Sequence, residues 1–142
     1  MEISDVKKRV FEAMERAKRA AADRRARVDE AAREYDVFLD QVAVPLFRQV
    51  ASVLKAEGLA FTVFTPRGSV RLMSDRSKDD YIEFALDTSG AYPQVIGLAS
   101  RGHGRRGTLS ETPIGRGGPV RDLTEQDVID FVTKELEAFL EK

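Results

Sequence analysis

The residues best suited to bind a ligand lie in one short segment that is rich in arginine and glycine. Between Arg101 and Arg121 the chain has five arginines and one histidine but a single acidic residue, Glu111. Guanidinium groups form forked hydrogen bonds with phosphate oxygens, and glycines let backbone N–H groups approach a phosphate closely. The basic Gly/Arg loop 101–107 is therefore a candidate polyanion-binding site, with these expected contacts: Arg101, His103, Arg105, Arg106 and Arg116. The alternative is a hairpin turn in which the glycines serve the turn and the arginines keep it soluble.

Residue types that carry out catalysis are sparse. The chain has no cysteine and one histidine, which excludes thiol nucleophiles, disulfides and a multi-histidine metal site within one chain. His103 has no partner visible in the sequence, and no serine occupies a Gly-x-Ser-x-Gly turn. Asp75, Asp79, Asp80 and Glu83 do not have the spacing of a calcium-binding EF-hand loop and are expected to be solvated. We therefore expect no enzymatic activity, no catalytic or metal-binding residue and no cofactor.

Length and charge describe the kind of protein in which these residues occur. The 142 residues correspond to about one domain, and 23 basic residues nearly balance 24 acidic ones. A net charge of −1 gives no general attraction to nucleic acids or acidic membranes. The longest apolar run, over residues 42–47, is far shorter than the roughly 20 residues of a membrane span, and no apolar stretch follows Lys7 and Lys8 as in a secretory signal. We expect a cytoplasmic protein with no membrane association.

The first 57 residues favour one unusually long helix. They contain no glycine, a single proline, and many Ala, Glu, Lys and Arg residues, with Ser4 as the expected N-cap and Gly58 as the residue that ends the helix. At 1.5 Å per residue this helix would be roughly 80 Å long, whereas a compact domain of this size is about 30–40 Å across. Pro45 interrupts the helical hydrogen bonding, so the sequence predicts a kink there or two helices.

Heptad spacing in the long helix predicts a surface for self-association. One heptad position holds Met14, Ala21, Val28, Tyr35 and Val42, and the other holds Val10, Ala17, Arg24, Ala31 and Phe38. Only Arg24 interrupts this seam, and the charged cluster 24–27 either flanks it or binds an acidic partner. The predicted self-association seam consists of Val10, Met14, Ala17, Ala21, Val28, Ala31, Tyr35 and Phe38.

The remainder of the chain predicts a sheet followed by one more helix. Alternating apolar residues separated by turn residues indicate five strands, near 59–64, 70–73, 82–86, 95–101 and 108–112, joined as an antiparallel meander. In this arrangement Arg71 and Glu83 face each other on neighbouring strands. After Thr124 as N-cap, apolar residues three and four apart predict an amphipathic helix with Phe131, Leu136 and Phe139 against the sheet.

The predicted fold class is α+β: a long N-terminal helix kinked or broken near Pro45, a five-stranded antiparallel meander and a C-terminal amphipathic helix. We expect residues 1–36 to form a protruding helical arm and residues 37–142 to form a compact domain. The leading functional hypothesis is a non-enzymatic interaction or assembly protein that uses the long helix for self-association, a homodimer being favoured, or for binding a partner helix. The alternative is a nucleic-acid-binding accessory protein that uses loop 101–107.

Overall fold

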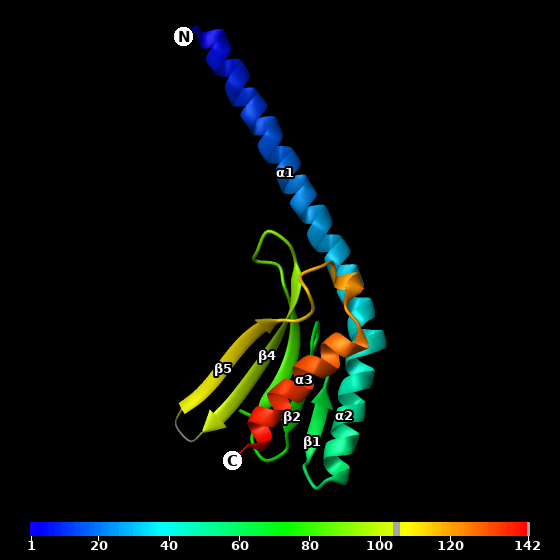
Figure 1. The fold of residues 1–142 in the computed structure, drawn as a ribbon. Coiled ribbons are helices and arrows are strands. Elements are labelled where there is room, and N and C mark those ends of the chain that lie inside the picture. The colour runs from blue at the N-terminus through cyan, green and yellow to red at the C-terminus, as the bar shows by residue number, and fades with distance from the viewer. Residues whose placement is uncertain (104–105, 142) are drawn as a thin grey trace.

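A computed structural model describes residues 1–103 and 106–141, without the side chains of residues 103 and 106. The chain has an α+β fold, as predicted, in which one long helix leads into a five-stranded sheet and a C-terminal helix (Figure 1). The elements in chain order are α1 (Ile3–Phe38), the π-helical turn η1 (Leu39–Ala43), α2 (Val44–Ala56), β1 (Phe61–Phe64), β2 (Val70–Ser74), β3 (Tyr81–Asp87), β4 (Gln94–His103), β5 (Arg106–Pro113), the 3-10 turn η2 (Val120–Asp122) and α3 (Glu125–Leu140).

The two ends of the long helix differ in how well the sequence predicts them. Ser4 is not the N-cap, because the helix starts at Ile3 and its N-cap is the extended residue Glu2. The Glu2 carbonyl oxygen accepts hydrogen bonds from the amides of Asp5 and Val6. At the other end, Gly58 closes the helix as predicted, with a φ of 83°. The amide of Gly58 donates to Lys55 and that of Leu59 donates to Leu54, at 3.0 and 2.8 Å. These two bonds satisfy carbonyls that a helix C-terminus otherwise leaves unpaired.

Pro45 produces a π-turn rather than a break between two helices. Since Pro45 has no N–H, the ordinary bond to the carbonyl of Gln41 cannot form. One residue earlier, the Val44 amide donates to Leu39, five residues back, which is the hydrogen bond of a π-helix. The helix therefore continues through η1, while its axis changes direction between α1 and α2 (Figure 1).

The sheet is the predicted antiparallel meander, in the order β1-β2-β3-β4-β5. Its register places Arg71 opposite Glu83, as expected. The last hairpin differs from the prediction because both of its strands are longer, and Gly102 pairs with Gly107 within the ladder. The predicted glycine-rich turn is therefore mostly strand.

Four aromatic rings form the centre of the core. Phe84 of β3 lies with its ring centroid 6.1 Å from that of Phe38, 5.0 Å from Phe47 and 5.6 Å from Phe131. The helices α2 and α3 cover one face of the sheet (Figure 1). The capping box of Thr124 and Asp127 starts α3 as the sequence predicts.

Burial along the helices corrects two expectations. Phe131 and Leu136 are buried as predicted, whereas Phe139 is only partly buried. After Pro45 the apolar spacing of Phe47, Val53 and Leu54 also predicts a core face, but Val53 is 63% exposed because it lies about a quarter turn away from Leu54.

Candidate functional site

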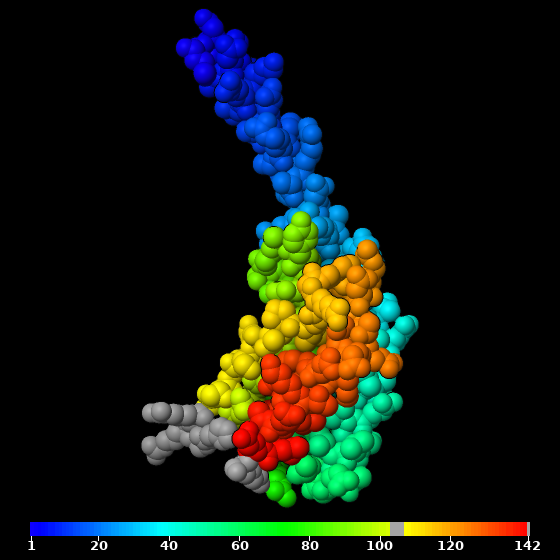
Figure 2. All heavy atoms as spheres, in the orientation of Figure 1, coloured from blue at the N-terminus to red at the C-terminus, as the bar shows by residue number. Residues whose placement is uncertain are grey.

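The N-terminal arm is the most distinctive surface of the molecule. Every residue from 1 to 27 is exposed, and the helix extends far beyond the sheet (Figures 1 and 2). Besides Met1, the exposed residues include five large apolar side chains: Ile3 at 85% exposure, and Val6, Val10, Phe11 and Met14 at 45–52%. A helix in water normally keeps such residues on a covered face, so this face is a candidate contact surface.

The predicted seam divides into two parts with different roles. Val10, Met14, Ala17 and Ala21 lie on the exposed arm, and Val28 is partly buried. The other three seam residues, Ala31, Tyr35 and Phe38, are 3–7% exposed and belong to the core of their own domain. Their assignment to a self-association seam is therefore wrong, because the sheet and the segment after β5 already cover them.

The compact domain consequently starts earlier than residue 37. The first hydrogen bond from the arm to the body, within the described residues, joins Arg24 Nη2 to the carbonyl oxygen of Thr88 at 3.5 Å. The guanidinium of Arg27 lies 5.3 Å from the centre of the Tyr92 ring. The free arm is thus residues 1–23, and the arginine cluster 24–27 uses two of its members to hold the β3–β4 loop rather than to flank a seam.

A cleft of about 450 Å³ lies where the arm meets the body, between α1, the β3–β4 loop and the segment after β5 (Figure 2). Two of its charged residues bind each other: Arg121 donates through its backbone amide and Nη1 to Glu34, at 3.2 and 3.3 Å. Together with the Arg27–Tyr92 contact, this ion pair joins three segments of the chain. The polar groups of the cleft therefore fix the direction of the arm.

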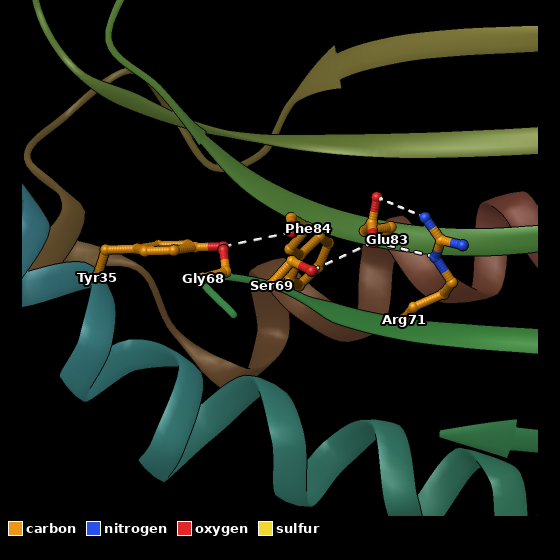
Figure 3. Close-up of polar contacts among 6 residues, drawn as sticks. All are labelled: Tyr35, Gly68, Ser69, Arg71, Glu83 and Phe84. Atoms are coloured by element: carbon orange, nitrogen blue, oxygen red, sulfur yellow. Dashed lines mark hydrogen bonds and ion pairs between the residues drawn. The ribbon is translucent and has the colours of Figure 1, made fainter. Parts of the chain in front are cut away.

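The hydroxyl of Tyr35 makes the most deeply placed polar contact at this junction. It donates to the carbonyl oxygen of Gly68 at 2.8 Å and lies 3.3 Å from that of Phe84 (Figure 3). Burial, with a smaller effect from the charges of Glu83 and Asp36, raises the pKa of Tyr35 well above its ordinary value. Tyr35 thus stays protonated and attaches the helix to the turn that precedes β2 and to β3.

Glu83 is the one charged residue that is buried in the described part of the chain, at 9% exposure. Arg71 Nε and Nη2 donate to its two carboxylate oxygens at 3.0 and 3.4 Å, and the Ser69 hydroxyl donates to one of them at 3.2 Å (Figure 3). The Arg71 guanidinium also lies 4.1 Å from the centre of the Tyr81 ring, and its hydrogen bonds to Glu83 raise the pKa of Arg71. The carboxylate has its partners, so this cluster is a structural pair and not an acid or base waiting for a substrate.

The candidate polyanion-binding residues do not form one group. Arg101 is on β4 and Arg116 follows β5, whose eight residues span about 26 Å. Arg116 therefore lies at the opposite end of β5 from the hairpin, because the basic segment is extended strand and not a loop that closes on itself. Arg105 lies outside the described residues, as do the side chains of His103 and Arg106.

Other kinds of site receive no support from the described residues. Among them no group of three His, Asp or Glu side chains is arranged to hold a metal ion. One helix, Ile3–Ala56, is long and apolar enough to cross a membrane by length and composition alone. That helix also supplies Phe38, Leu39, Phe47 and Leu54 to the core, and 28% of its apolar stretch is buried.

Comparison with known proteins adds no assignment: no protein-family model, no curated protein and no solved structure matches the chain.

Proposed function

We propose that this chain is a non-enzymatic assembly protein that associates with itself through its N-terminal arm. The observation that carries the proposal is the set of five large apolar residues, between Ile3 and Met14, that the arm presents beyond the reach of its own domain. An arm that served only as a soluble spacer would have polar residues at these positions.

The size of this surface indicates how strong the association is. Covering a fully exposed apolar side chain contributes about 1.5–3 kcal/mol, so two arms with largely half-exposed side chains gain on the order of 10 kcal/mol. Association costs about 4–15 kcal/mol in lost freedom of motion. Because these quantities are of similar size, we expect a weak dimer whose population depends on concentration.

The direct test is the mass of the protein in solution. Light scattering and sedimentation over about 1 to about 300 µM cover the range in which such a dimer forms. We expect the mass to rise from that of one chain to that of two, and a chain that lacks residues 1–23 to stay monomeric while keeping its sheet. A full chain that stays monomeric over the whole range contradicts the proposal.

Two matched variants separate the apolar face from helix stability. Val10→Gln with Met14→Gln removes two apolar side chains of the seam, whereas Ala22→Gln with Ala26→Gln makes changes with the same four-residue spacing on the opposite side of the arm. We expect the first variant to be monomeric and the second to dimerise like the unchanged protein. Equal effects of the two variants would attribute the loss to the helix and not to the apolar face.

Salt separates this function from the nucleic-acid alternative. Apolar pairing strengthens slightly or stays unchanged as salt increases, whereas binding to phosphates weakens steeply. The structure moves Arg116 away from the other basic candidates, which reduces the support for the nucleic-acid function. Retention of the protein on DNA at about 50 mM salt, lost after Arg105 and Arg106 are both neutralised, would restore it.

A further inference from the structure

Large and small residues are unevenly distributed along the free arm. The large apolar residues Ile3, Val6, Val10, Phe11 and Met14 lie within residues 3–14, and beyond Met14 this side of the helix has alanines, at positions 17, 20 and 21. Both groups lie on the exposed part of one straight helix (Figure 1). Because the two parts of the arm differ in side-chain size, the contacts between two copies depend on whether their arms are parallel or antiparallel.

A parallel, in-register pair would use this surface poorly. Every seam residue would face its own copy, so large residues would meet large ones at one end and alanines would meet alanines at the other. Lys7, which shares a heptad position with Met14 and Ala21, would face the Lys7 of the second copy within the seam. Such a pair places two like charges in contact and cannot keep an even spacing between the helices.

An antiparallel pair resolves both problems. When the two helices cross near residue 12, Ile3 faces Ala21 of the second copy, Val10 faces its Met14 and Lys7 faces its Ala17. Val6 then lies beside Ala20 of the second copy, and the two Phe11 rings meet near the centre. At both ends of the overlap large residues therefore face small ones, and no lysine in the seam faces another lysine.

The length of the free arm supports the same register. A crossing at residue 12 overlaps residues 1–23 of both copies, and Arg24 is the residue at which the arm joins its own body. Shifting the overlap by one heptad toward the bodies would bring Lys7 against Arg24. The same shift would place Ser4 of one copy against Arg27 of the other, at the junction where Arg27 and Tyr92 pack.

We propose that two copies of this chain pair in antiparallel orientation through residues 1–23, with the two-fold axis near residue 12. This inference rests on the proposed self-association. The overlap is about 35 Å long and places the two bodies at opposite ends of the paired arms.

Disulfide trapping tests the orientation. Because the chain has no cysteine, only the introduced thiols can form a disulfide. In the proposed pair the two copies of position 21 are 18 residues apart along the axis, about 27 Å, far beyond the reach of a disulfide. Positions 3 and 21 of different copies are adjacent. A mixture of the Ile3→Cys and Ala21→Cys variants, one of them carrying a tag, should therefore form the mixed disulfide, and the Ala21→Cys variant alone should not cross-link.

The matched control is Ala22→Cys, which moves the thiol by one residue to the outer side of the helix and should form no mixed disulfide with Ile3→Cys. A homodisulfide of the Ala21→Cys variant would overturn the antiparallel orientation in favour of a parallel pair. A dimer by light scattering that forms no mixed disulfide would overturn the register. A chain that stays monomeric at all concentrations would overturn the proposed function itself, so the failures are distinguishable.

Discussion

Gly97, in the middle of β4, lies directly beneath the ring of Phe131 from α3. A methyl group added at this position would lie 2.6 Å from Cε1 of the Phe131 ring and closer still to Cζ. The ring cannot move freely along the sheet, because it also packs against Phe84, the cross-strand neighbour of Gly97, whose ring centroid is 5.6 Å away. The Gly97→Ala substitution should therefore force α3 away from the sheet.

The expected cost follows from two opposing effects. Overpacking a well-filled core typically costs about 1–3 kcal/mol. Replacing glycine within a strand recovers about 0.5–1 kcal/mol through the lower entropy of the unfolded chain. We expect Gly97→Ala to lower the free energy of unfolding by roughly 1–2 kcal/mol, since the contact is with a ring that also packs against Phe84.

A double-mutant cycle isolates the contact from the other effects. Phe131→Ala should cost about 3–5 kcal/mol because the side chain is buried. The vacated space accommodates the new methyl group, so in that background Gly97→Ala should show only the entropic gain of about 0.5–1 kcal/mol. The two changes should therefore be non-additive by about 1.5–3 kcal/mol. Urea unfolding followed by circular dichroism measures each free energy.

A loop glycine provides the control for this cycle. A methyl group at Gly90 would come no closer than 3.9 Å to any neighbouring atom, so Gly90→Ala should change stability by no more than about 0.5 kcal/mol. If Gly97→Ala cost equally much with and without the Phe131 ring, the proposed packing of α3 on β4 would be refuted.

Three other predictions concern the polar contacts of Tyr35 and Glu83. Tyr35→Phe should cost about 1–2 kcal/mol in urea unfolding, because the buried Gly68 carbonyl loses its donor. Burial raises the pKa of Tyr35 above its ordinary value of 10.0, so the folded chain holds this proton more tightly than the unfolded one. The contribution of Tyr35 to the free energy of unfolding should be complete below pH 10 and should decrease as the pH rises further. The decrease should be smaller for Tyr35→Phe, and an equal dependence on pH in the two proteins would contradict the raised pKa of Tyr35. Arg71→Met should cost about 1–3 kcal/mol, because Glu83 keeps only the Ser69 hydroxyl, and a neutral effect would show that water replaces the guanidinium.

Local patterns predict the sheet well because each of its strands shows its own signal. Alternation along β2 and β3 is sufficient to place Arg71 opposite Glu83, and the Thr124–Asp127 capping box marks the start of α3 directly in the sequence. Gly97 also has a signal, since an isolated glycine within a strand indicates close approach of another group. That signal says nothing of which group approaches, which depends on how α3 crosses the sheet.

The candidate site is harder to predict because it depends on contacts between distant segments. Arg24 and Arg27 resemble any charged helix surface in the sequence, and only the position of the β3–β4 loop shows that they bind Thr88 and Tyr92. The basic segment 101–107 has the composition of a flexible loop. Strand pairing overrides the usual preference of Gly102 and Gly107 for turns, and Arg116 lies beyond the far end of β5.

The π-turn explains why the predicted heptad spacing does not follow the buried face of the helix beyond Phe38. The predicted seam continues from Tyr35 to Val42, seven residues later. The extra residue in the turn at Leu39–Ala43 shifts the buried face, so that Ala43 is fully buried and Val42 only partly. The core face thus runs through Phe38, Ala43 and Phe47, with a five-residue step that no regular α-helix has. Because the helix is continuous through this turn, the packing of Tyr35 and Phe38 in the core also sets the direction in which the apolar side chains of residues 3–14 face. A single helix therefore packs on its own domain from Ala31 onward and carries exposed apolar side chains near its N-terminus, where we propose that a second copy binds.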